Sequence, residues 1–312
     1  MLRVARHIIP PPPSETVNAI MTDGATIVLR RHGNPDGPRV ALSHGNGMAI
    51  EAYYPFWRQM LADYDVILFD ARNHGRNPAD GVENHTQTQI GQDFETVRTT
   101  IDRAFGTRPC GAIFHSLASI ASLVQTRRFG ECWSPLIMVD PPVFPPPGHP
   151  LVPLQTTHMK EMDAIAARRP ERFQDPEDLA AVLRSRKAFR RWPDGLHELY
   201  ALETLRQSDD GWKLACPRAL EARIFATNID PTIWPDVAGF PGNIAIIGAD
   251  TDLPETGPPA LLCQALAQEH GLPYIMIEDS THFLQLERSD TAWAAAEAHF
   301  KSFGVVCPVA QP

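Results

Sequence analysis

Short apolar runs alternate with amphipathic helical stretches along the chain, and this alternation constrains the fold more than any other feature of the sequence. The predicted strands before residue 141 are residues 39–44, 65–70, 111–115 and 134–140. A predicted helix over residues 92–105 carries its apolar side chains on one face. Strands separated by helices pair in parallel, so we expect an α/β fold with a mostly parallel central sheet flanked by helices on both faces.

The pattern changes after a proline cluster at residues 141–150. Successive prolines forbid a helix or a central strand there. Residues 142–240 then show helical segments without convincing strands, and the alternation resumes at residues 243–248. We therefore expect a core formed by residues 1–141 and 241–312, with residues 142–240 inserted as a helical cap.

Composition excludes several classes of partner. The formal net charge is −9 without a long basic run, which argues against binding to nucleic acid or to an anionic membrane. The segment before the prolines at 10–13 is too short and polar for a signal peptide or a membrane span, so we expect a cytoplasmic protein. Five cysteines without a C-x-x-C pair favour neither disulfides nor a zinc site. We expect no metal, no cofactor and an apolar small molecule as partner. The sequence leaves open whether the protein is a homo-oligomer.

Ser116 follows a predicted strand and precedes a predicted helix, in the stretch GAIFHSLASIAS. This context is typical of a nucleophile elbow, which exposes a serine at the carboxyl edge of a sheet. A helix N-cap is the alternative interpretation. The G-x-S-x-G pattern favours small residues at both flanks; Ala118 satisfies it and Phe114 does not.

His282 is the candidate base, because it follows the last predicted strand and precedes the last helix. Asp250 and Asp252 follow the preceding strand, which fits the chain order serine, acid, histidine. We favour Asp250 as the acid because it lies closest to the strand end. Asp252 remains an alternative, with a turn role as its competing interpretation. Asp140 is a third candidate, for which capping or structure is the simpler explanation.

The glycine-rich loop at residues 43–49 follows an early strand and can turn backbone N–H groups inward. Asn46 or Gly47, together with the N–H of Leu117, are the predicted oxyanion donors. Gly47, Met48 and Tyr53 are also predicted to contact substrate.

Two residues farther along the chain are weaker candidates for the pocket. Trp234 lies near the end of the predicted cap and is expected to contact substrate. His85 could also face the pocket, although a surface loop is the favoured interpretation.

Five motifs occur in order: HGNG at 44–47, DARNHGRN at 70–77, HSLAS at 115–119, GADTD at 248–252 and THFLQLE at 281–287. Together they resemble the successive signatures of the α/β-hydrolase fold superfamily, with residues 142–240 in the place of its variable cap. The resemblance implies a serine hydrolase with Ser116 as nucleophile, His282 as base and Asp250 as acid.

Aromatic side chains in the predicted cap, such as Trp192 and Trp234, indicate an apolar substrate, and resemblance to lid-bearing lactonases adds macrocyclic lactones to the class. We expect an apolar or aromatic carboxylic ester or lactone, macrocyclic lactones included, cleaved without a cofactor. The alternatives are a carbon–carbon bond hydrolase of ring-cleavage products and a noncatalytic member that binds a small ligand.

Overall fold

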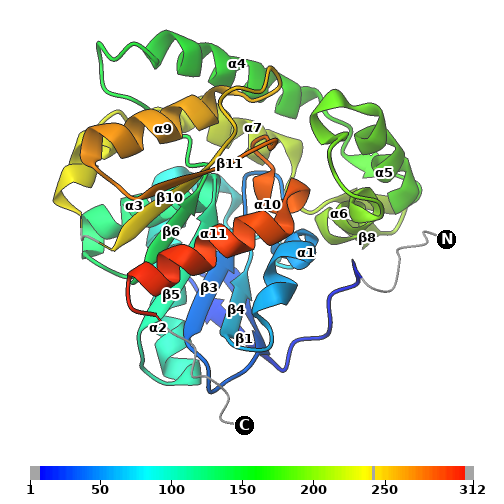
Figure 1. Ribbon diagram of the computed structural model, residues 1–312. Coiled ribbons are helices and arrows are strands. Elements are labelled where there is room, and N and C mark those ends of the chain that lie inside the picture. The colour runs from blue at the N-terminus through cyan, green and yellow to red at the C-terminus, as the bar shows by residue number, and fades with distance from the viewer. Residues whose placement is uncertain (1–7, 241–242, 306–312) are drawn as a thin grey trace.

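An eight-stranded sheet lies at the centre of the structure, a computed structural model that describes residues 8–240 and 243–305 (Figure 1). Its strands, in spatial order, are β1 (Glu15–Ile20), β2 (Thr26–Gly33), β4 (Asp65–Phe69), β3 (Arg39–Ser43), β5 (Cys110–His115), β6 (Leu136–Val139), β10 (Ile244–Ala249) and β11 (Tyr274–Ile277). Every pairing from β4 to β11 is parallel, and only β1–β2 and β2–β4 are antiparallel. The predicted mostly parallel sheet is confirmed.

The antiparallel β1–β2 pair begins the described core and turns at Asp23-Gly24. The Asp23 carboxylate accepts a hydrogen bond from the backbone N–H of Ala25, and Gly24 has a positive φ of 86°. A glycine adopts this φ without steric cost. An Asp-Gly pair between two short apolar runs is a sequence signal for a hairpin turn, and a hairpin is what the structure has here.

Helices cover both faces of the sheet, as the sequence predicts. The helices of the core are α1 (Tyr54–Trp57), α2 (Gln87–Phe105), α3 (Leu117–Phe129), α9 (Pro258–His270), α10 (Leu284–Glu287) and α11 (Ser289–Ser302). Alternate residues of one strand enter different cores: Val40 and Leu42 pack with residues of α1 and α11, whereas Ala41 packs with residues of α2 and α3. Both sheet faces are therefore buried. Among the described helices, none combines the length and the apolar character needed to cross a membrane.

The chain leaves the sheet after β6 and returns to it at β10, and the segment between these strands contains further helices and a small second sheet. The elements are α4 (Val152–Arg168), β7 (Arg172–Phe173), α5 (Pro176–Ser185), α6 (Leu196–Thr204), β8 (Leu205–Ser208), β9 (Gly211–Leu214), α7 (Arg218–Thr227) and α8 (Ile233–Asp236). We call residues 142–240 the cap segment. The expectation of helices without strands is wrong here, because β7, β9 and β8 pair as a three-stranded antiparallel sheet.

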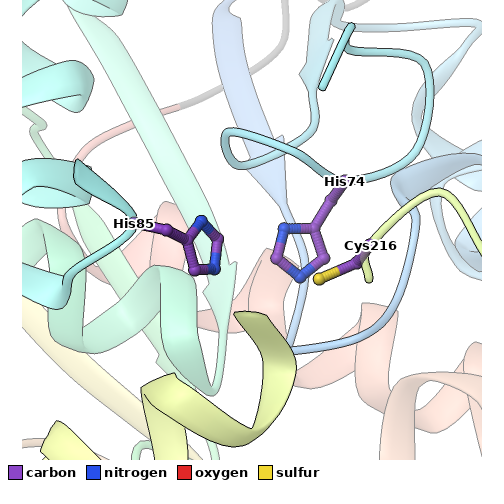
Figure 2. A group of neighbouring side chains, drawn as sticks. All are labelled: His74, His85 and Cys216. Carbon is purple, nitrogen blue, oxygen red and sulfur yellow. The ribbon is translucent and has the colours of Figure 1, made fainter. Parts of the chain in front are cut away.

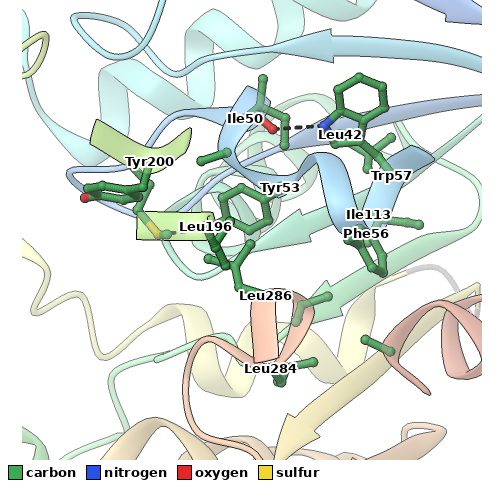
Figure 3. Close-up of a cluster of buried hydrophobic side chains, with 14 of the residues drawn as sticks. Leu42, Ile50, Tyr53, Phe56, Trp57, Ile113, Leu196, Tyr200, Leu284 and Leu286 are labelled. Atoms are coloured by element: carbon green, nitrogen blue, oxygen red, sulfur yellow. Dashed lines mark hydrogen bonds between the residues drawn. The ribbon is translucent and has the colours of Figure 1, made fainter. Parts of the chain in front are cut away.

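Helix α6 attaches the cap segment to the loop that follows β3 (Figure 3). Leu196 and Tyr200 of α6 join the same buried cluster as Ile50 and Tyr53, which belong to a 3-10 helix after that loop. The Tyr200 hydroxyl also donates a hydrogen bond of 2.9 Å to the backbone carbonyl of Gly47. The cap segment therefore helps to fix the glycine-rich loop.

Candidate active site

Ser116 occupies a sharp turn between β5 and α3. Its backbone has φ 51° and ψ −109°, a strained conformation for any residue except glycine. Although Ser116 is the N-cap residue of α3, its side chain makes no capping hydrogen bond. Its Oγ lies 3.0 Å from Nε2 of His282. The turn therefore directs the hydroxyl to an imidazole instead of to the helix end.

The large residue at the elbow flank is accommodated in the core that the sheet forms with α2 and α3. Phe114 is fully buried and meets Phe69 and Trp133 edge to face, with ring centroids 5.8 and 5.2 Å apart. Ala118 is fully buried as well. A glycine at position 114 is thus unnecessary, because an aromatic cluster fills the space beside the turn.

His282 links Ser116 to a buried carboxylate. Its Nδ1 lies 2.6 Å from Oδ2 of Asp140, the first residue after β6, and this carboxylate is completely buried. Asp140 Oδ1 accepts a hydrogen bond from the backbone N–H of Ala249. Because a carboxylate can only accept here, Nδ1 of His282 carries the proton and Nε2 is free to accept from Ser116.

The structure therefore corrects the predicted acid from Asp250 to Asp140. The Asp250 carboxylate accepts hydrogen bonds from the backbone N–H groups of Asp252 and Asp279, at 2.9 and 2.8 Å. Both of its oxygens are thus engaged in holding a turn. Asp252, the other alternative, is exposed to solvent.

His115 connects the glycine-rich loop to the loop of His282. Its Nε2 donates to the backbone carbonyl of His282 at 2.9 Å, and its Nδ1 lies 2.6 Å from the hydroxyl of Tyr53. The same hydroxyl accepts a hydrogen bond from the backbone N–H of Gly45. Burial and the neighbouring His282 hold the pKa of His115 well below its usual value, so the ring is neutral and Nδ1 accepts from Tyr53.

The glycine-rich loop runs beside Ser116, as an oxyanion loop would. A Cβ on Gly45 would lie 3.3 Å from that of Ser116, so the loop and the elbow are in close contact. Among the described residues, the backbone N–H groups of Asn46 and Leu117 have no protein acceptor, whereas that of Gly47 donates to His74 Nε2 at 3.0 Å. Of the two loop donors predicted, only Asn46 is therefore available.

The chain matches a known family in the alternation of its strands and helices and in the segment that contains the serine–histidine–aspartate contacts. Residues 40–296 match the model described as the Alpha/beta hydrolase family. The chain belongs to the alpha/beta hydrolase family. A search of curated proteins gave no match.

Solved structures with this fold resemble the chain over nearly its whole length. E-2-(Acetamidomethylene)succinate hydrolase has a TM-score of 0.74 and 16% identity, covering 92% of this chain and 100% of its own. The thioesterase domain from the curacin biosynthetic pathway has a TM-score of 0.68 and 16% identity, covering 90% of this chain and 98% of its own. A malate-bound thermophilic esterase from Thermogutta terrifontis has a TM-score of 0.66 and 14% identity, covering 93% of this chain and 99% of its own. At these identities the likeness concerns the fold.

A cavity of about 740 Å³ lies between the alpha/beta hydrolase core and the cap segment. Ser116, His282, Asn46 and Leu117 line it together with apolar side chains of α4, α5 and α7. Of the residues predicted to contact substrate, Met48 is part of this lining.

The other three predicted contacts are not part of the cavity lining. Gly47 and Tyr53 are not among its lining residues, and Tyr53 is instead buried beneath the loop. Trp234 is buried against the core, where its Nε1 donates to Glu269 at 2.8 Å and its ring lies against His149. These positions correct the prediction, because the side chains that were expected to meet substrate support the fold.

His74, His85 and Cys216 form a buried cluster, with ligand atoms within 4.8 Å of one another (Figure 2). His85 was expected on the surface but is fully buried. His74 Nδ1 donates to the carbonyl of Arg72 and its Nε2 accepts from Gly47, so both nitrogens already have partners. Burial also raises the pKa of the Cys216 thiol. The cluster fits a neutral support for the loop better than a metal site.

Two histidines of the site were missed by the sequence reasoning. His115 directly precedes Ser116, and that adjacency was the available signal, but a His-Ser pair alone is common. His158 of α4 lines the cavity, and burial together with the nearby His282 lowers its pKa to about 4. No local pattern marked it, because it reaches the site from the cap segment. The free thiols among the described residues are those of Cys110, Cys132, Cys216 and Cys263, while Cys307 lies outside them.

Proposed function

We propose that this protein is a serine hydrolase that cleaves a carboxylic ester or lactone of an apolar small molecule. The hydrogen-bonded series Ser116 Oγ, His282 Nε2, His282 Nδ1 and Asp140 Oδ2, with distances of 3.0 and 2.6 Å, carries the proposal. This series ends in the wall of the cavity, where a carbonyl carbon can approach Ser116. A base within hydrogen-bond reach of a hydroxyl, itself oriented by a carboxylate, is the arrangement that activates serine.

In the proposed reaction, Ser116 Oγ attacks the substrate carbonyl while His282 Nε2 takes its proton. The carbonyl π electrons move onto oxygen, and the backbone N–H groups of Asn46 and Leu117 donate to this oxyanion. Collapse of the tetrahedral intermediate breaks the bond to the leaving oxygen, which receives the proton from His282. Water then attacks the acyl-enzyme while His282 takes its proton. Collapse of the second tetrahedral intermediate breaks the bond to Ser116 Oγ, which receives that proton from His282, and the acid is released.

Asp140 keeps its charge throughout the proposed cycle. Its completely buried carboxylate holds His282 in the tautomer that leaves Nε2 free, and it stabilises the imidazolium that forms when Ser116 is deprotonated. The hydrogen bond from Ala249 fixes the second carboxylate oxygen.

The lining of the cavity supports an apolar substrate. Most of its side chains are aliphatic, aromatic or thioether groups, and the cap segment supplies the larger part of these, including Met159, Leu183 and Phe189. The volume of about 740 Å³ lies within the usual range for sites that bind molecules of drug size.

The proposal is tested by a p-nitrophenyl ester series with acyl chains of two to twelve carbons and an aromatic lactone panel, assayed with wild type and Ser116→Ala. Covalent labelling by a fluorophosphonate, with the labelled residue located by mass spectrometry, shows directly whether Ser116 is a reactive nucleophile. We expect turnover and labelling in wild type and neither in the variant. Labelling without ester or lactone turnover would replace the proposal with carbon–carbon bond hydrolysis, and a vinylogous diketo acid is then the substrate to assay. Absence of both would favour a noncatalytic binding protein.

A further inference from the structure

The residues that line the cavity have a positive net charge, whereas the net charge of the whole chain is negative. The charged residues of this lining are Arg168, Arg169, Arg186, Lys187, Arg191, Glu221 and Glu255. With five cations and two anions, the lining has a formal balance of +3, whereas the chain carries −9. His158 adds no charge at neutral pH, because its pKa lies at about 4. A cavity lined mainly by apolar atoms thus has a cationic perimeter.

Three of the five cations are paired with acidic groups of the protein. Arg169 contacts Glu221 at 2.5 Å, beside the oxyanion loop, where Asn46 Nδ2 donates to the Glu221 carbonyl. Arg191 contacts Asp279 at 2.5 Å, and Lys187 lies 3.9 Å from Glu255. These pairs leave little cationic character for a ligand.

The other two cations, Arg168 and Arg186, make no side-chain hydrogen bond or ion pair with another described residue. Arg168 is in the last turn of α4, and Arg186 follows α5. Both are exposed to solvent, whereas Ser116 is only 8% exposed. The two guanidinium groups therefore stand at the outer edge of the cavity and the hydroxyl at its inner wall.

The cavity wall also contains apolar side chains from three helices of the cap segment. Met162 of α4, Leu179 and Leu183 of α5, and Ile224 of α7 contribute to it. A ligand that complements the cavity from Ser116 to its edge has a carbonyl at the inner end, an apolar middle and an anionic group at the outer end.

We propose that the substrate carries a carboxylate separated from its scissile carbonyl by an apolar chain, and that Arg168 and Arg186 select it at the edge of the cavity. This inference rests on the proposed function and narrows its substrate class. A guanidinium group recognises a carboxylate through paired N–H donors. Opposite charge at an exposed rim acts on capture of the ligand more than on chemistry.

The test compares two p-nitrophenyl esters of equal chain length, one with a free carboxylate at the far end of the acyl chain and one with a carboxamide there. Acyl chains of four to ten carbons cover the span of the cavity. For wild type in 20 mM buffer, we expect kcat/KM to favour the carboxylate roughly five- to tenfold, mainly through KM. The preference should shrink in 0.5 M NaCl, because salt screens exposed charges.

The variant Arg168→Gln/Arg186→Gln should lose this preference and keep kcat for the carboxamide ester. Arg172→Gln/Arg184→Gln is the matched control: it removes two exposed arginines of the cap segment that pair with acidic residues and do not line the cavity. The control should keep the preference. Thermal unfolding of both variants separates lost recognition from lost stability.

Equal kcat/KM for the two esters in wild type would overturn the inference and leave the proposed function standing. Persistence of the preference in Arg168→Gln/Arg186→Gln would also overturn it. If neither ester is hydrolysed, the proposed chemistry has failed, and binding of the two esters to Ser116→Ala is measured by calorimetry. Tighter binding of the ester with the carboxylate would still support recognition by Arg168 and Arg186. Equal binding would refute this recognition as well as the proposed function.

Discussion

Nδ1 of His282 lies 2.6 Å from a carboxylate oxygen of Asp140, which is the first residue after β6 and begins the path into the cap segment. Asp250 is the first residue after the neighbouring strand β10, but its carboxylate accepts no hydrogen bond from His282, because backbone N–H groups donate to both of its oxygens. Two aspartates at one edge of the sheet thus have separate tasks.

Replacing each aspartate by asparagine distinguishes the carboxylate that pairs with His282 from the one that holds the turn. Asp140→Asn should lower kcat by about 10³- to 10⁴-fold, because the amide cannot hold His282 in the productive tautomer. Asp250→Asn should reduce kcat by less than about tenfold, since it weakens hydrogen bonds to the turn and leaves the imidazole paired. The measurement is hydrolysis of one p-nitrophenyl ester by both variants, with circular dichroism as the control for folding. Equal losses would contradict the assignment of Asp140.

His115 should act as a positioning residue for His282. His115→Phe leaves the His282 carbonyl and the Tyr53 hydroxyl without their partner, so the base loses its fixed position. We expect kcat to fall about 10- to 100-fold with KM nearly unchanged. His115→Gln, which can still donate to the carbonyl, should recover part of the loss. A purely structural role would instead lower the thermal midpoint of both variants without this difference in kcat.

The strained backbone at Ser116 predicts an unusual order of stability between two inactive variants. At φ 51° a glycine is relaxed and an alanine is not. Ser116→Gly should therefore be more stable than Ser116→Ala by about 1 kcal/mol, opposite to the usual effect of glycine. Urea unfolding of the two variants measures this difference. A more stable alanine variant would show that the turn relaxes in solution.

Burial of His85 predicts a loss of stability in acid. Burial, with a smaller effect of Arg72, lowers the pKa of His85 to about 4 from the ordinary value of 6.5. The unfolded chain therefore binds this proton first as the pH falls, and stability declines between about pH 6.5 and 4.

From pH 7.5 to 5.0 the contribution of this one group is about 2 kcal/mol. His85→Gln keeps an acceptor for Asn73 and should lose about 2 kcal/mol less than wild type over that range. Urea unfolding at the two pH values checks this. The same acid loss in both proteins would mean that His85 is not held neutral by the fold.

The strand pattern was sufficient to predict the sheet, because five of the six parallel strands are fully buried and leave nearly continuous apolar runs such as residues 65–69 and 244–249. It failed for the second sheet. β7 has two residues and β8 and β9 have four each, too few for periodicity to register. Those strands exist because they pair with one another in the cap segment.

Position after a strand was sufficient to predict that Ser116 and His282 lie together, and insufficient to predict which carboxylate lies beside His282. β6 and β10 are parallel neighbours with Val139 opposite Ile247, so Asp140 and Asp250 reach the same edge of the sheet. Side-chain direction decides between them, and it depends on the positive φ of 45° at Asp140. Sequence carries little trace of such a backbone angle when the residue is not glycine.

The location of Asp140 at the exit from β6 sets a practical limit on recombining this chain with its relatives. A chimera that exchanges the cap at a junction before residue 140 would remove the carboxylate paired with His282, while a junction after Pro142 would keep it. The two prolines that follow Asp140 hold that exit in an extended course. Crossovers for a library of exchanged caps therefore belong on the far side of those prolines.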